Sequence, residues 1–102
     1  MNEELIKKSA ELISKSKNVV AVTGAGISVE SGIPDFRSPG GLWSKYPPEE
    51  YATIEAFYDN PDKVWVLFYE IGETLSKAKP NPAHYALAKL ERLGHLVAVI
   101  TQ

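Results

Sequence analysis

The segment from Val22 to Ser38, VTGAGISVESGIPDFRS, contains the residues of this chain that are best suited to binding a phosphate group. Gly24 and Gly26 allow a tight turn and a close approach of the backbone to a ligand. The residues that follow, ISVESG, are predicted to form a short helix, and the unsatisfied N–H groups at a helix N-terminus bind anions. The segment therefore predicts a site for a nucleotide phosphate, with a tight structural turn as the alternative.

The two commonest nucleotide signatures do not match this spacing. A dinucleotide fingerprint requires a third small residue at position 29, where this chain has Val29, and its next glycine is Gly32. No strand ends in an acidic residue about 20 residues later, and the lysine of a P-loop is absent. An ordinary hydride-transferring dehydrogenase is therefore a poor match, and the spacing alone leaves the ligand open.

Two apolar runs around this segment predict a parallel sheet. The valine-rich stretches 18–23 and 95–102 are typical of strands that are covered on both faces. Because helices separate them, the two strands are expected to be joined by a right-handed parallel crossover. The connection holds about 70 residues, far more than a crossover helix needs, so the extra residues predict a helical lobe.

Asparagine and glycine mark the predicted ends of the helices. Asn2 caps a helix over 2–16, and Asn60 and Asn81 each precede a proline, which suits the first position of a helix. Gly94 can end the last helix in a left-handed conformation. The order of elements is therefore helix, strand, loop, helical insertion, helix and strand, which is an α/β pattern.

The stretch from Pro34 to Pro48 has no hydrophobic periodicity and contains four prolines and two glycines. We predict a long mobile loop here, and loops of such length inside a compact domain are often functional. Its aromatic residues Trp43 and Tyr46, with Tyr51 just beyond, are expected to hold the loop and the helical lobe against the core.

The composition of the chain argues against several kinds of binding partner. The formal net charge is -2, so we expect no direct nucleic-acid binding, and the absence of cysteine leaves no thiolate metal site in this chain. No apolar run reaches the roughly 20 residues of a membrane span, and no membrane partner is expected. The N-terminal sequence MNEELIKK is wrong for a secretory signal, so a cytoplasmic location is predicted.

The longer string GAGIS followed by SGIPDFR resembles the signature of the sirtuins, the NAD-dependent protein-lysine deacylases, and GLW, KPNPAH and ITQ follow in that family's order. The resemblance runs along the whole chain and covers the first part of a domain of roughly 250 residues. It implies a Rossmann-like parallel sheet with a helical insertion, present here as an N-terminal portion with two strands. The implied segments are a strand and NAD-binding loop over 18–33, a mobile cofactor loop over 34–52, a helical lobe over 53–78, and a helix and second strand over 81–102.

The resemblance implies that NAD is the cofactor and that the glycine-rich loop holds its phosphates. Gly24, Ala25 and Gly26 would cradle the pyrophosphate with their backbone N–H groups. Ser28 and Val29, on the first turn after the loop, would line the same ligand. Gly24, Ala25, Gly26 and Ser28 match the family's motif residue by residue, whereas position 29 is variable in that motif.

The resemblance also implies roles near the nicotinamide. Asp35 and Phe36 would lie beside the nicotinamide and its ribose, where the phenylalanine shields the reactive anomeric carbon from water and from returning nicotinamide. Arg37 would hold phosphate or order the loop, with a simple surface ion pair to Asp35 as the alternative. Gln102 would contact the ribose near the reaction centre.

No catalytic base is assigned within the chain. The family's general base is a histidine followed by glycine, and neither His84 nor His95 is followed by glycine. The general base and the four zinc cysteines are expected beyond Gln102, so zinc belongs to the part that is not in this chain. Two strands with open edges expose apolar surface, so the isolated chain is predicted to be inactive and marginal or aggregation-prone.

The implied reaction moves the acyl group of an acylated protein lysine to ADP-ribose and releases nicotinamide. An NAD hydrolase or an ADP-ribosyltransferase of the same fold remains open, and so does a non-catalytic module that binds NAD or ADP-ribose. Sirtuins that prefer acidic acyl groups carry a tyrosine and, three residues later, an arginine. Here Tyr69 is followed by Gly72 at that spacing, so a neutral acyl group such as acetyl is expected.

Overall fold

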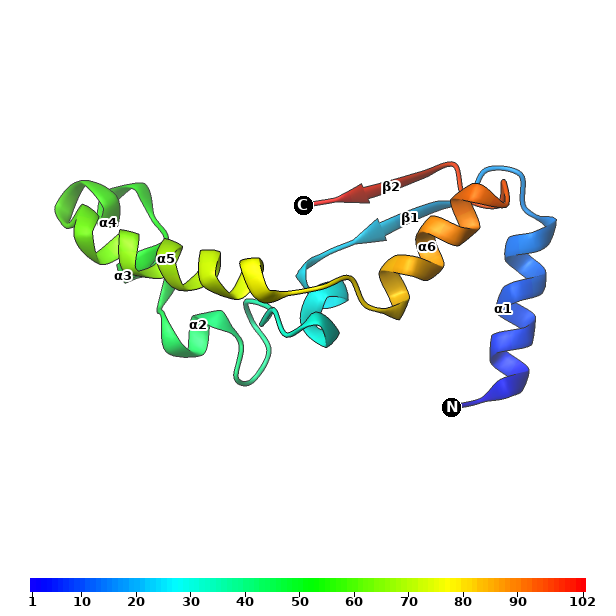
Figure 1. The fold of residues 1–102 in the computed structure, drawn as a ribbon, viewed down its shortest axis with the longest axis horizontal. Helices are drawn as coiled ribbons and strands as arrows, with labels where there is room; N and C mark the ends of the chain where they lie inside the picture. The colour runs from blue at the N-terminus through cyan, green and yellow to red at the C-terminus, as the bar shows by residue number, and fades with distance from the viewer. The chain divides into compact units, whose positions relative to one another are not determined.

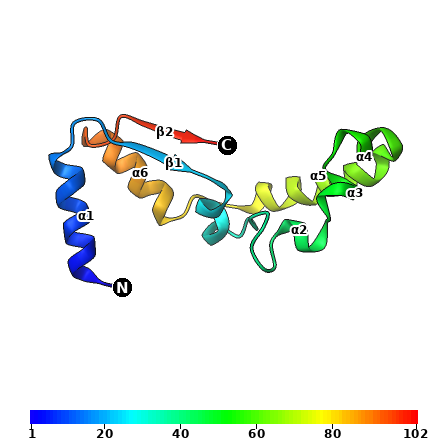
Figure 2. The same ribbon diagram turned by 180° about the vertical axis from the view of Figure 1, so that it is seen from behind.

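A computed structural model describes all 102 residues of the chain. The chain divides into two compact units, one formed by Met1–Gly24 together with Pro82–Gln102 and the other by Ala25–Asn81. Figures 1 and 2 show the elements of both units from opposite sides. No helix combines the length and the apolar character that crossing a membrane requires.

The first unit contains a two-stranded parallel sheet, in which β1 (Val20–Thr23) and β2 (Ala98–Thr101) run side by side (Figure 1). Val20 lies opposite Ala98 and Thr23 lies opposite Thr101. The predicted parallel pairing of the two valine-rich runs is therefore confirmed, with each strand shorter than predicted.

The prediction that both strands are covered on both faces is wrong for this structure. β1 alternates between exposed and half-buried residues, and β2 is exposed along its length. Two strands have two open edges and too little sheet to bury either face, so their apolar side chains keep contact with solvent. The predicted exposure of apolar surface along the second run is confirmed by Val99 and Ile100, which are 41% and 59% exposed.

One end of each helix in the first unit is fixed by hydrogen bonds of nearby residues. α1 (Glu3–Lys15) begins after Asn2, whose side-chain oxygen accepts hydrogen bonds from the N–H groups of the first turn. α6 (Pro82–Arg92) is followed by Gly94 at φ +81°. The N–H of Gly94 donates to Glu91 O and that of His95 to Leu90 O, the two bonds of a Schellman motif. The predicted cap and helix end are confirmed.

The second unit is helical, and its longest helix is α5 (Pro61–Lys77). Asn60 caps this helix by accepting a hydrogen bond from Lys63 N at 3.3 Å, as predicted, and Thr53 caps the preceding helix through Ala56 N. The unit's elements are η1 (Ala25–Ser31), a 3₁₀ helix, and the α-helices α2 (Leu42–Lys45), α3 (Pro48–Tyr51), α4 (Ile54–Asp59) and α5 (Pro61–Lys77).

The stretch from Pro34 to Pro48 contains more helix than the sequence predicted. The helix α2 lies within it, and α3 begins at its end. Each helix has four residues, barely one turn, which is too short for a periodic hydrophobic pattern to predict it. Tyr46 is buried and packs edge-on against Tyr51, with ring centroids 5.0 Å apart, so one of the three predicted aromatic anchors lies in the core of the lobe.

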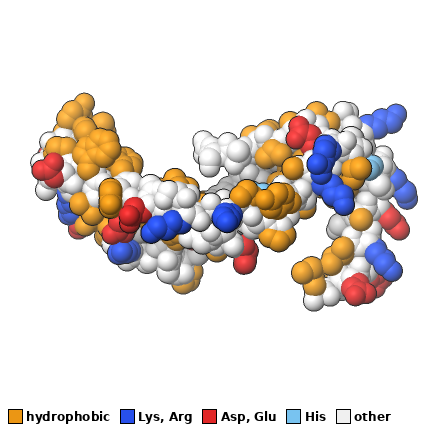
Figure 3. Space-filling view, viewed as in Figure 1, with side chains coloured by type: hydrophobic (Ala, Val, Ile, Leu, Met, Phe, Trp, Pro, Cys, Tyr) orange, Lys and Arg blue, Asp and Glu red, His pale blue; other side chains and the backbone are white.

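The core of the helical lobe is small. Its buried apolar residues are Tyr46, Ala56, Val64 and Leu67. Other apolar side chains gather on the surface over α4 (Figure 3), where Ile54 and Tyr58 are exposed. Few side chains therefore hold the lobe together, and a change to any of them should have a measurable effect.

Replacing Val64 with alanine is expected to lower the free energy of unfolding of the lobe by about 2 kcal/mol, because two buried methyl groups are lost and a cavity remains. Val64 is 3% exposed, whereas Val66 on the same helix is 52% exposed and provides the matched control. Urea denaturation of the complete protein, followed by tryptophan fluorescence, measures both variants. Equal destabilisation by Val64→Ala and Val66→Ala would contradict this assignment of the core.

Candidate functional site

The glycine-rich loop after β1 has an open backbone. Neither Gly24 nor Gly26 has a positive φ, and a Cβ added to either would meet no atom within 4 Å. The backbone conformation at these two positions is therefore open to any residue, and their predicted role in close approach to a ligand rests on the absence of a side chain. The space above both residues is free for a ligand that approaches the main chain closely.

Gly24 also lies next to another predicted site residue, Gln102, in the first unit. Thr23 and Thr101 are paired in the parallel sheet, and Gly24 and Gln102 follow them directly. Both residues are therefore at the carboxyl ends of neighbouring parallel strands. Ligands of open α/β sheets bind at this edge.

The helix η1 carries the predicted residues Ala25, Gly26, Ser28 and Val29 and ends at Ser31, directly before Gly32. Gly32 has φ +88°, and it is the glycine in this segment whose backbone conformation disfavours a side chain. Its N–H donates to Val29 O at 2.9 Å, and the N–H of Ile33 donates to Ser28 O. These bonds close η1 with the same pattern that ends α6 at Gly94.

Asn81, which is distant in the sequence, forms hydrogen bonds to η1. The amide nitrogen of Asn81 donates to Ile27 O at 2.8 Å and to Ser31 Oγ at 3.0 Å. Sequence reasoning assigned Asn81 only the role of a helix cap. No local pattern could have indicated a contact between residues that are 54 and 50 positions apart.

The segment that follows forms a closed loop through Asp35. The N–H of Leu42 donates to Asp35 O at 2.6 Å, and that of Gly41 donates to Ser38 O at 2.7 Å. The Asp35 carboxylate accepts a hydrogen bond from the Ser38 hydroxyl. The loop is so tight that a Cβ on Gly41 would lie 2.7 Å from Asp35 Oδ1 and 2.8 Å from the carbonyl oxygens of Asp35 and Ser38.

Phe36 stacks on Trp43 at the mouth of an open pocket. Their ring centroids are 5.1 Å apart and their planes meet at 29°. Arg37 forms no ion pair with Asp35, so the alternative of a simple surface ion pair is wrong. The pocket has a volume of about 360 Å³ and brings predicted site residues of the second unit together with one more aromatic ring; it is lined by Ala25, Asp35, Phe36, Arg37 and Trp43.

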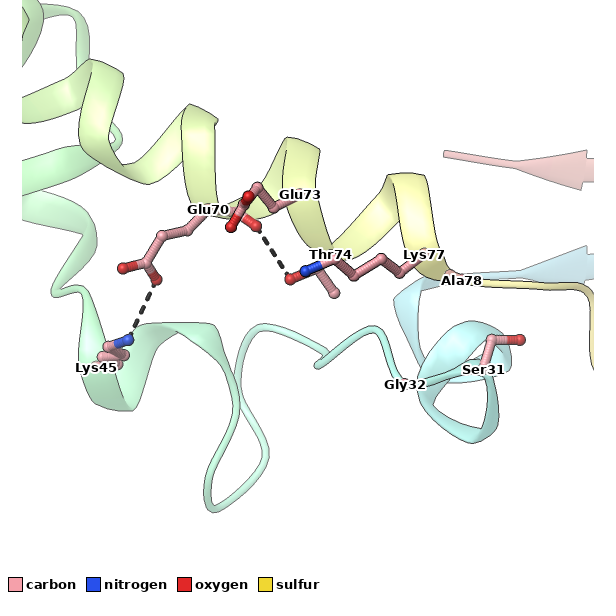
Figure 4. A pocket seen from close by; sticks show the side chains of 8 residues that line it. All are labelled: Ser31, Gly32, Lys45, Glu70, Glu73, Thr74, Lys77 and Ala78. Carbon is pink, nitrogen blue, oxygen red and sulfur yellow. Dashed lines mark hydrogen bonds and ion pairs between the residues drawn. The ribbon is translucent and has the colours of Figure 1, made fainter.

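A second, polar pocket of about 480 Å³ separates η1 and α2 from α5 (Figure 4). Lys45 on α2 forms an ion pair with Glu70 on α5 at 3.2 Å, and its ammonium lies 5.2 Å from the centroid of the Tyr46 ring. Lys63 on α5 pairs with Glu50 on α3 at 2.9 Å. Both ion pairs fasten the 34–52 segment to α5, and sequence reasoning missed them because their partners are distant in sequence.

The pKa of Glu70 is held below its ordinary value of 4.5, first by the Tyr46 hydroxyl and then by the Lys45 ammonium. Because folding lowers this pKa, the ionised carboxylate stabilises the folded state above pH 4.5, and this stabilisation is lost as the pH falls through the lowered value. We expect Tyr46→Phe to bring the pKa of Glu70 closer to 4.5 than Lys45→Met does, measured by ¹³C NMR titration of the carboxyl group. The reverse order would mean that charge outweighs the hydroxyl.

Residues 24–102 match the Sir2 family. The chain therefore belongs to the Sir2 family. It is 56% identical over 100 residues to NAD-dependent protein deacylase 2 of Archaeoglobus fulgidus, and 57% identical over 99 residues to the NAD-dependent protein deacetylase of Sulfolobus acidocaldarius. These alignments cover 98% and 97% of this chain but 39% of each relative, so the chain spans about two fifths of their length.

Solved structures confirm the predicted fold. A Sir2 enzyme solved in work on the mechanism and regulation of these enzymes matches with a TM-score of 0.88 and 54% identity, covering 99% of this chain and 40% of that one. A complex of a Sir2 homologue with NAD matches with a TM-score of 0.78 and 51% identity, covering 100% of this chain and 38% of that one. The chain thus has an α/β fold of the Sir2 family, with a two-stranded parallel sheet and a helical insertion.

Proposed function

We propose that the protein containing this chain is an NAD-dependent protein-lysine deacylase and that these residues form much of its NAD site. One observation carries the proposal: Gly24 and Gln102 follow neighbouring parallel strands, and a Cβ at Gly24 would meet no atom within 4 Å, which leaves its backbone open to a phosphate group. The relatives' names and the NAD complex of a homologue that aligns with the whole chain support the choice of ligand.

In this proposal the phosphates bind at the start of η1. Gly24, Ala25 and Gly26 donate backbone N–H groups to the pyrophosphate, because a side chain at either glycine would fill the space above the main chain. Ser28 and Val29 line the same ligand from η1. A guanidinium at Arg37, which has no ion-pair partner, is available to a phosphate oxygen.

The nicotinamide end of the ligand belongs to the pocket lined by Phe36. Phe36, held by its stack on Trp43, covers the anomeric carbon and excludes water. Asp35 fixes the loop that carries Phe36 through its bonds to Ser38 and Leu42, and Gln102 contacts the ribose. When bound, NAD supplies an ADP-ribosyl group that accepts the acyl group as nicotinamide leaves.

The acylated lysine of a protein is the second substrate in this proposal. A relative with 42% identity and a TM-score of 0.75 was solved as a complex of Sir2 with a p53 peptide and NAD+. Gly72, three residues after Tyr69, offers no cation to an acidic acyl group, and the Tyr69 hydroxyl donates to Glu73 at 3.5 Å. We therefore propose a preference for neutral acyl groups such as acetyl.

The test uses the complete protein that contains these residues, NAD and an acetyl-lysine peptide. Equal amounts of deacetylated peptide, nicotinamide and O-acetyl-ADP-ribose are expected, and a succinyl-lysine peptide should react far more slowly. Nicotinamide release without peptide deacetylation would instead identify an NAD hydrolase or an ADP-ribosyltransferase. Binding of ADP-ribose with no nicotinamide release would identify a non-catalytic binding module.

A further inference from the structure

Asn81 is a buried polar residue whose side chain binds the proposed phosphate-binding helix. It is 6% exposed, and its amide nitrogen uses both hydrogens, one for Ile27 O and one for Ser31 Oγ. Satisfied polar groups in a buried site fix geometry, because losing one partner leaves the other without a hydrogen bond. The contact therefore constrains η1 at two points, in its middle and at its last residue.

The backbone around Asn81 is stiff. Pro80 and Pro82 flank it, so the φ angles on both sides are fixed and Asn81 itself is confined to extended conformations. A side chain presented by such a backbone loses little further freedom when it forms its bonds. The sequence therefore predicts a stiff backbone at Asn81, from which its side chain reaches η1.

The two contact points on η1 lie next to the residues of the proposed NAD site. Ile27 stands between Gly26 and Ser28, and Ser31 precedes Gly32, whose positive φ redirects the chain. We propose that Asn81 is a positioning residue for NAD: it holds η1 in the conformation that presents its N–H groups to the phosphates. This inference rests on the proposed function.

The test measures the dissociation constant of ADP-ribose for the complete protein by isothermal titration calorimetry. Asn81→Asp keeps the shape of the side chain but turns an acceptor toward Ile27 O, so we expect an affinity at least about tenfold weaker. In the deacylation assay the same variant should raise KM for NAD and leave kcat at saturating NAD nearly unchanged. A variant that binds ADP-ribose as tightly as the wild-type protein would overturn the inference.

Val64→Ala separates positioning from a general loss of stability. This change destabilises the helical lobe without touching η1, so it is expected to leave the dissociation constant of ADP-ribose unchanged at a temperature where all variants are folded. Weaker binding by Val64→Ala, equal to that of the Asn81 variant, would show that stability alone governs affinity and would overturn the inference.

A double-mutant cycle tests the bond to Ser31 directly. Because Asn81→Ala and Ser31→Ala remove opposite ends of one hydrogen bond, their effects on ADP-ribose affinity should be less than additive. Additive effects would contradict positioning through this contact. If the wild-type protein does not bind ADP-ribose, the proposed function fails and the inference fails with it, which is a different result from equal binding by wild type and variants.

Discussion

Replacing Phe36 with alanine is expected to lower the rate of deacylation by about 100-fold while weakening NAD binding only slightly. Phe36 is 45% exposed, lines the pocket together with Ala25 and Arg37, and stacks on Trp43. Its loss admits water to the anomeric carbon, so the ratio of nicotinamide released to peptide deacetylated should also rise. Steady-state kinetics with quantified products measures both effects.

Phe68→Ala is the matched control for this prediction. Phe68 is 50% exposed and pairs with a tryptophan, Trp65, at a centroid distance of 5.6 Å, but it lies on α5 and does not line the Phe36 pocket. Its removal should leave the kinetics unchanged. If Phe36→Ala turned over normally, or if both variants lost activity equally, Phe36 would have no place at the reaction centre.

The sequence predicted the features of the fold that depend on neighbouring residues. Asn2 and Asn60 cap helices because a side-chain oxygen reaches an N–H group two or three positions ahead. Gly94 ends α6 because glycine adopts the left-handed conformation without a steric penalty, and this depends on no residue elsewhere in the chain. The parallel pairing of β1 with β2 followed from the order of elements and the handedness of crossovers.

Burial of the strands could not be predicted in the same way. Valine-rich composition indicates residues that favour burial, but burial also requires other elements to cover them. In this chain Val22 remains 78% exposed, although it lies within β1. The composition of a strand therefore reports a preference, whereas its exposure depends on how much sheet and helix surround it.

The resemblance assigned ligand roles to residues of the candidate site but no contacts among them. The closed loop through Asp35 and the grip of Asn81 on η1 depend on three-dimensional approach, which residue types do not reveal. Gly41 is the clearest case, since its sequence context, Pro-Gly-Gly, indicates only a turn. The structure shows that the second glycine of this pair is crowded and the first is not.

Gly41→Ala is expected to reduce turnover at least as much as Phe36→Ala and to lower stability by about 3 kcal/mol, the upper end of the usual cost of overpacking. Its backbone has φ -71°, so the cost is steric rather than conformational. The new Cβ would lie 2.8 Å from the carbonyl oxygens of Asp35 and Ser38. Neither can retreat without breaking the hydrogen bond that closes the loop, and the stack of Phe36 on Trp43 would open with it. Kinetics and urea denaturation measure the two effects.

Gly40→Ala distinguishes crowding from backbone strain. Gly40 has φ +79°, and a Cβ there would meet no atom within 4 Å, so alanine should cost only about 1 kcal/mol and should leave the closed loop in place. Turnover by Gly40→Ala should therefore exceed turnover by Gly41→Ala by about tenfold or more. The opposite order would mean that the left-handed turn, rather than the close packing of Asp35 against Gly41, holds Phe36 in place. In that case the position of Phe36 would depend on the conformation of one residue and not on the hydrogen bonds that close its loop.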